Sequence, residues 1–150
     1  MIGPHVADDE NGGWRIEGGE SDLHPPSSTL HPRVAARAPI TVQATYYIIT
    51  GIWPLVHLAS FEAVTGSKTD DWLVQTVGAL VIVIGATLAV AATRLRGRPS
   101  PELLTLALGA AIAFIAVDVG FVLSDAIGPI YLADAGVQAA LVVWIVARLS

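Results

Sequence analysis

Three ionisable side chains interrupt otherwise apolar stretches of the sequence, and their types could support chemistry. They are His57, Asp118 and Asp134. Imidazole and carboxyl groups can exchange protons, and both can form hydrogen bonds. Because an ionisable group within a membrane segment is costly, such residues usually face the interior of a helix bundle or water. What these three residues can do therefore depends on whether the surrounding elements bring them together.

Four long apolar runs carry these residues and decide the class of protein. They span residues 40–61, 72–93, 103–123 and 130–149. Each is close to the ~20 residues that a helix needs to cross the hydrocarbon core of a bilayer. The chain of 150 residues is 53% hydrophobic and only 14% charged, whereas soluble domains carry about 25% charged residues. The sequence therefore predicts an all-α, polytopic membrane protein that has the lipid bilayer as a partner.

The connections between the runs are short, which predicts an up-down four-transmembrane-helix bundle over residues 39–150. Pro54 is expected to kink the first helix, because proline donates no backbone hydrogen bond. Asp70 and Asp71 are expected to cap the second helix rather than to act in chemistry. Ser100 can cap the third helix, and Pro101 suits its first turn.

In such a bundle, five polar side chains are expected at a similar depth: His57, Gln75, Asp118, Asp134 and Gln138. At 1.5 Å per residue, each lies within about two turns of the helix end that faces one common side of the bundle. Two interpretations of this polar layer are open. The side chains could bond to one another and fix helix register, at roughly 0.6–2 kcal/mol per contact. Alternatively, they could line a pocket that opens to the outer face, where a carboxyl group could share a proton with His57.

Several other kinds of site lack the residues they would need. The chain has no cysteine, which excludes disulfides, thiolate nucleophiles and cysteine-ligated metals. His5, His24 and His31 show no metal-site spacing, and His57 is the only histidine in the apolar runs. We therefore expect no metal, haem or other cofactor. The net charge of −5 argues against nucleic acid as a partner.

Basic residues gather at one end of the predicted bundle: Arg33, Arg37, Arg94, Arg96, Arg98 and Arg148. The opposite end has Lys68 as its only base. The positive-inside rule then places both termini in the cytoplasm, in a multi-pass protein of the inner membrane. Residues 1–38 are acidic and rich in Gly, Pro and Ser, without the apolar segment of a signal peptide. They are expected to form a cytoplasmic tail that is disordered or bound to a partner.

Small residues recur on one face of each of the last three predicted helices. Such faces let helices approach closely, so they are expected to be packing surfaces. They comprise Gly78, Gly85, Ala89 and Ala92, then Gly109, Ala113, Ala116 and Gly120, and finally Gly136 and Ala140.

Three segments carry a family resemblance: "YYIITGIWPLVHLASFE", "VTGSKTDDWLVQTVG" and "AVDVGFVLSDAIGPIYLADA". Their order and layout resemble a group of small prokaryotic four-helix integral membrane proteins and, more loosely, the DoxX-like superfamily. The resemblance covers about residues 40–149. It implies at most quinone-linked redox chemistry or association with redox partners, and it assigns no catalytic residue.

Two functions of different classes follow from these observations. The first is an accessory or scaffold subunit of a membrane complex, which packs through its small-residue faces against other membrane protein subunits or a second copy. The alternative is a membrane enzyme or a binder of a small molecule, such as a quinone, that uses the polar layer. A proton-coupled transporter is a third expectation. Whether the protein is an enzyme stays open.

Overall fold

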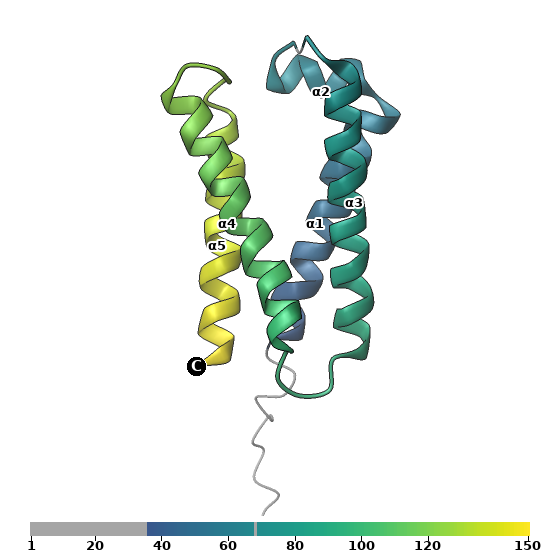
Figure 1. Cartoon of the computed structure of the whole chain (residues 1–150), viewed down its shortest axis with the longest axis vertical. Coiled ribbons are helices and arrows are strands. Elements are labelled where there is room, and N and C mark those ends of the chain that lie inside the picture. The colour runs from purple at the N-terminus through teal and green to yellow at the C-terminus, as the bar shows by residue number, and fades with distance from the viewer. Residues whose placement is uncertain (1–35, 68) are drawn as a thin grey trace, which may run out of the picture.

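The computed structural model describes residues 36–67 and 69–150, and within them the chain is helical without strands (Figure 1). The helices are α1 (Arg37–Val56), α2 (Leu58–Thr65), α3 (Asp71–Arg94), α4 (Pro101–Leu123) and α5 (Tyr131–Leu149). The predicted all-α class is confirmed for this part of the chain. The predictions for Lys68 and for residues 1–35 of the tail lie outside the described residues.

Three of the helices are each long and apolar enough to cross a membrane. These are α3, α4 and α5, and their ends fall within two residues of the predicted ranges. α1 meets the same criterion only together with α2, and these two helices are bent by 111° relative to each other. The structure thus contains three continuous candidate spans and one broken helix pair.

The first predicted helix differs from the structure in its last five residues, because α1 ends at Val56 instead of continuing to Phe61. Pro54 lies in its last turn and cannot donate a backbone hydrogen bond to Thr50. Three residues later, His57 has φ −147° and ψ 71°, outside the helical region. Its N–H still donates to the carbonyl of Trp53 at 2.9 Å. In place of a kink at Pro54, the helix thus breaks at His57, one turn later, and α2 starts there in a new direction.

Local contacts hold this break in place. The Nδ1 atom of His57 accepts a hydrogen bond from the N–H of Ser60 at 3.2 Å, so His57 caps α2. The hydroxyl of Ser60 in turn accepts from Nε1 of Trp53 at 2.8 Å. The rings of Trp53 and Phe61 meet edge to face, with centroids 5.7 Å apart. Residues within a few positions of Pro54 thus fix where α2 points.

The caps of the long helices agree only in part with the sequence prediction. Ser100 caps α4 as predicted, accepting a hydrogen bond from the N–H of Leu103 at 3.3 Å, and Pro101 occupies the first turn. Asp70 precedes α3, but its side chain makes no capping hydrogen bond. Asp71 lies in the first turn of α3, where a carboxylate faces the positive end of the helix dipole.

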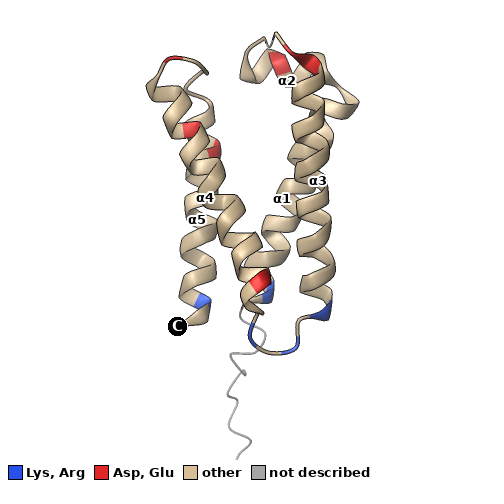
Figure 2. Cartoon of the chain, in the orientation of Figure 1, with Lys and Arg blue, Asp and Glu red and all other residues tan. Residues whose placement is uncertain are grey.

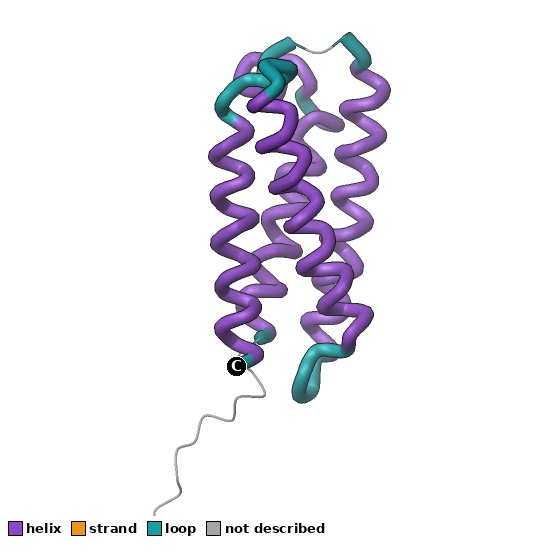
Figure 3. The backbone as a smooth tube through the Cα atoms, turned by 60° about the vertical axis from the view of Figure 1, so that its left-hand side comes forward, coloured by secondary structure: helices purple, strands orange, loops and turns teal. Residues whose placement is uncertain are grey.

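The long helices form two closely packed pairs, α1 with α3 and α4 with α5 (Figures 1 and 3). Glycines let α1 and α3 touch backbone to backbone. A Cβ atom on Gly51 would lie 2.6 Å from the carbonyl oxygen of Gly78, and one on Gly85 would lie 2.9 Å from that of Ala44. Gly78 and Gly85 therefore belong to a packing face, as predicted.

The predicted small-residue faces of α4 and α5 behave differently. A Cβ atom on Gly109, Gly120 or Gly136 would meet nothing within 4 Å among the described residues. These glycines thus pack against no other helix of the described chain.

The two pairs join through a hydrophobic core and then diverge toward the end of the bundle opposite to the C-terminus (Figure 1). The core is made of small and branched side chains from all four long helices, including Ile40, Ala44, Leu88, Ala107 and Ile145. α2 lies across the diverging end (Figure 1). This divergence creates the space in which the candidate site lies.

The arginines lie at one end of the bundle together with a single acid, Glu102, and the other described acids lie toward the opposite end (Figure 2). We call one the arginine end, which holds Arg37, Arg94, Arg96, Arg98 and Arg148. We call the other the acidic end, which holds Glu62, Asp70, Asp71 and Asp125. The two helix pairs diverge toward the acidic end (Figures 1 and 2).

Candidate functional site

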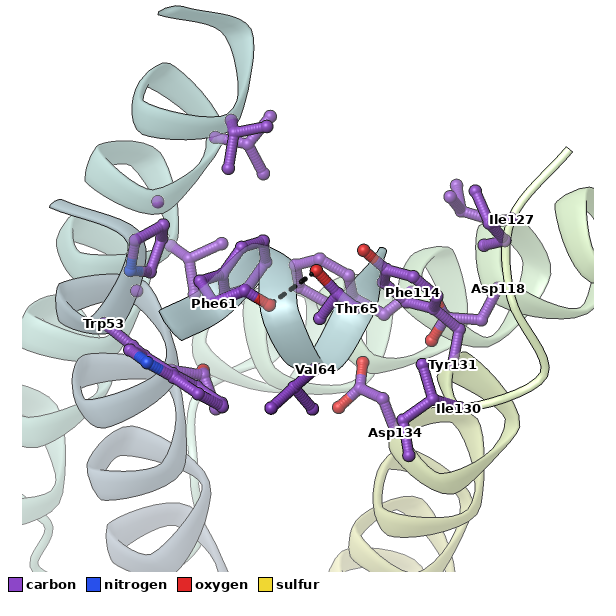
Figure 4. A pocket seen from close by; sticks show the side chains of 18 of the residues that line it. Trp53, Phe61, Val64, Thr65, Phe114, Asp118, Ile127, Ile130, Tyr131 and Asp134 are labelled. Atoms are coloured by element: carbon purple, nitrogen blue, oxygen red, sulfur yellow. Dashed lines mark hydrogen bonds between the residues drawn. The ribbon is translucent and has the colours of Figure 1, made fainter. Parts of the chain in front are cut away.

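A cavity of about 570 Å³ opens between the two helix pairs, and all five helices contribute to its walls. Most of the lining is apolar. Aromatic side chains are prominent in it: Tyr46, Trp53, Phe61, Phe114, Phe121 and Tyr131. Figure 4 shows α2 with Phe61, Val64 and Thr65 between Trp53 of α1 and the α4–α5 pair. The break after Pro54 thus supplies one wall of the cavity.

Five polar side chains of the lining form what we call the polar cluster: Tyr46, Tyr47, Asp118, Asp134 and Gln138. The hydroxyl of Tyr46 donates a hydrogen bond to Oδ1 of Asp134. The hydroxyl of Tyr47 donates to Oε1 of Gln138 at 3.0 Å. Nε2 of Gln138 lies 3.5 Å from Oδ1 of Asp134. The two tyrosine bonds connect α1 to α5, which otherwise have few contacts.

Gln43 lies one turn before Tyr47 on α1 and donates hydrogen bonds next to the polar cluster. It is fully buried, and its Nε2 atom donates to the hydroxyl of Tyr47 at 3.1 Å and to the carbonyl of Ala107 at 2.7 Å. The ring of Tyr47 packs edge to face on Phe114, with centroids 5.6 Å apart. Tyr47, itself only 1% exposed, is therefore held by contacts from α1, α4 and α5.

Asp118 brings a carboxyl group into the cluster from α4. Its side chain is 4% exposed and lies next to the carboxyl group of Asp134 (Figure 4). Its Oδ2 atom is buried and has no hydrogen-bond partner among the described residues. A buried acceptor without a donor costs about 1–3 kcal/mol. The cluster thus contains one buried acceptor, Oδ2 of Asp118, that no described residue satisfies.

The structure unites three of the five residues of the predicted polar layer: Asp118, Asp134 and Gln138 line the cavity. His57 and Gln75 do not belong to it. His57 is exposed at the break, because the chain turns by 111° there and leaves the axis of α1. Gln75 is exposed on α3, one turn before the first glycine contact with α1. The structure therefore does not bring His57 next to Asp118.

Sequence reasoning missed the contribution of α1, namely Gln43, Tyr46 and Tyr47. A signal was available, because Gln43, Tyr46, Tyr47 and Thr50 follow the i, i+3, i+4, i+7 spacing of one helix face. The hydroxyl group of a buried tyrosine usually forms a hydrogen bond. Two tyrosines in the middle of α1, away from its ends, thus mark a polar face of this helix.

The chemistry open to this arrangement is the binding of a molecule with an apolar body and a polar group. Within residues 36–67 and 69–150, no group of three or more His, Cys, Asp and Glu side chains is placed to hold a metal ion. No protein-family model, curated protein or solved structure matches the chain. The case for a function therefore depends on the geometry of the cavity.

Proposed function

We propose that the protein is an integral membrane protein of four spans that binds a lipophilic small molecule in the cavity between its helix pairs. The observation that carries the proposal is an apolar, aromatic cavity with a largely buried polar cluster that bridges α1 and the α4–α5 pair. Small-molecule sites typically occupy about 300–1,000 Å³ and combine apolar walls with a few placed polar groups. A quinone, which the family resemblance implies, is one ligand of this kind.

The first span in this proposal is α1, completed by α2. The 20 residues of α1 extend over about 30 Å, the thickness of the hydrocarbon core. Arg37 stands at its start and α2 at its end. The arginine end would lie on the cytoplasmic side, with both termini there, and the cavity would lie in the outer leaflet of the inner membrane.

Binding can be measured with Trp53, which lines the cavity. The other tryptophans, Trp14, Trp72 and Trp144, are replaced by phenylalanine so that Trp53 is the single reporter. The probe is 4-(4-iodophenyl)butan-1-ol, a neutral lipophile whose iodine atom quenches tryptophan fluorescence on contact. In lipid nanodiscs we expect saturable quenching by the probe, above the linear background from partition into lipid.

A matched pair of variants on α5 assigns this signal to the cavity. Ala133 lines the cavity, whereas Ala140 is exposed two turns away and is absent from its walls. Ala133→Phe should abolish saturable quenching by filling the space, and Ala140→Phe should leave it intact. Equal quenching in the two variants, or none in the parent protein, would exclude the cavity as a binding site.

A second candidate function is an accessory or scaffold subunit, which the uncovered glycines of α4 and α5 favour. Gly109, Gly120 and Gly136 meet no side chain or backbone of the described chain. Glycine faces in membrane helices commonly pack against other helices, so another subunit or a second copy could cover them. Native mass spectrometry from membrane vesicles would distinguish a stoichiometric assembly from a single chain. A single chain without partners would count against this role.

A further inference from the structure

We infer that the ligand of this cavity is a lipophilic amine, bound as a cation with its ammonium group beside Asp118 and Asp134. This inference rests on the proposed binding function and specifies the chemistry of the ligand. Two observations lead to it: the polar cluster lacks a donor for one buried acceptor, and aromatic side chains make up much of the remaining wall.

The hydrogen bonds of the cluster show what a ligand has to supply. The hydroxyl proton of Tyr46 is directed at Asp134, and that of Tyr47 is directed at Gln138. Oδ2 of Asp118, on a side chain more than nine-tenths buried, receives no hydrogen bond within the described part of the chain. A ligand that carries N–H groups would satisfy this acceptor, whereas a ligand with acceptors alone would not.

The charge of the cavity lining also favours a cationic ligand. Two carboxyl groups lie next to each other on the α4–α5 side of the cavity (Figure 4). Among the described residues that line it, none is lysine, arginine or histidine. An anionic ligand would therefore meet only like charge, and a cation would find an opposite charge in a setting of low dielectric, where the attraction is strong.

The aromatic walls suit the apolar body of such a ligand and its charge. Cations are attracted to the faces of tryptophan, tyrosine and phenylalanine rings, more strongly where water is excluded. Trp53, Phe61, Phe114 and Tyr131 line the same cavity as the two carboxyl groups, with Phe114 and Tyr131 nearest to them (Figure 4). A neutral quinone could stack on the same rings, but its carbonyl oxygens are acceptors and would leave Oδ2 of Asp118 without a donor.

Three probes with one skeleton test the inference in the Trp53 quenching assay. They are 4-(4-iodophenyl)butylamine, the matching neutral alcohol and the matching butanoate. The amine should bind on the order of tenfold more tightly than the alcohol, and the butanoate more weakly than both, because one opposite charge in a partly desolvated site contributes this much. Asp118→Asn should weaken amine binding by about tenfold and alcohol binding much less, because the alcohol carries no charge.

Controls keep the outcomes distinct. Asp125 is an exposed carboxylate in the turn after α4, so Asp125→Asn should change none of the affinities. Alcohol binding by Asp118→Asn shows that this variant is folded. Equal affinity for amine and alcohol, or preference for the butanoate, would overturn the inference and leave the lipophile site standing. Absence of saturable binding by all three probes would overturn the proposed function as well.

Discussion

Replacement of Tyr47 by phenylalanine should destabilise the helix bundle by about 1–2 kcal/mol. The change keeps the ring, which packs on Phe114, and removes only the hydroxyl. That hydroxyl donates to Gln138 and accepts from Gln43. Gln43 retains its bond to the carbonyl of Ala107, whereas Oε1 of Gln138, on a side chain 1% exposed, loses its donor. The loss is thus dominated by one orphaned acceptor, with a cost of about 1–3 kcal/mol, reduced toward the smaller values found for polar contacts within membranes.

A double-mutant cycle isolates this contact. Gln138→Leu removes the acceptor at similar side-chain volume, so the combined loss in Tyr47→Phe/Gln138→Leu should fall short of the sum of the single losses by about 1 kcal/mol. The assay is unfolding by sodium dodecyl sulfate in mixed micelles, followed by helical circular dichroism. Gln75→Leu is the matched control, because Gln75 is exposed on α3, and its effect should add to that of Tyr47→Phe. Additive losses in the Tyr47–Gln138 pair would mean that the two side chains do not meet and would refute the polar cluster.

Three further predictions test other parts of the structure. Gly51→Ala should cost about 1–3 kcal/mol of stability in the same unfolding assay because of overpacking, since the new Cβ would lie 2.6 Å from the carbonyl oxygen of Gly78. The control Gly109→Ala adds a methyl group in open space and should be nearly neutral. Equal losses of stability in the two variants would contradict the α1–α3 packing. Pro54→Ala should let α1 continue past His57 and carry α2 away from the cavity, which would lengthen the distance between spin labels on cysteines at Val64 and Ala133; the chain has no native cysteine, and an unchanged distance would show that proline does not cause the break. A cysteine at Ser67 should react with an impermeant thiol reagent on intact cells and one at Ser100 should not; the reverse pattern would place the cavity on the cytoplasmic side.

Much of the candidate site could be read from depth along the helices, because the rise per residue is fixed. Asp118, Asp134 and Gln138 were expected at one level, and the structure places them in one cavity wall. Depth alone does not say which way a side chain points. Gln75 has a matching depth but is exposed on α3, and Tyr47, which meets Gln138, was not considered.

The break after Pro54 shows a second limit. Proline predicts a disturbed helix, since its nitrogen donates no hydrogen bond. It does not predict the direction of the chain beyond the disturbance. That direction depends on the contacts of Trp53 with Ser60 and Phe61 and on the cap from His57, which together turn α2 by 111°. His57 consequently caps α2 at the break and lies outside the polar cluster.

The sequence by itself determined the helical class, the positions of α3, α4 and α5, and the gathering of the arginines at one end. These features depend on hydropathy, local breakers and charge, which are properties of each segment alone. The tertiary structure decided that Gly51 and Gly78 pack while Gly109 stays uncovered, and that the helix pairs diverge around an aromatic cavity. Lipid chains are as apolar as leucine, so hydrophobicity does not determine which face of a helix packs against another helix. Close backbone contacts and the buried hydrogen bonds of Tyr46, Tyr47 and Gln43 make that choice, and they exist only once the helices have come together.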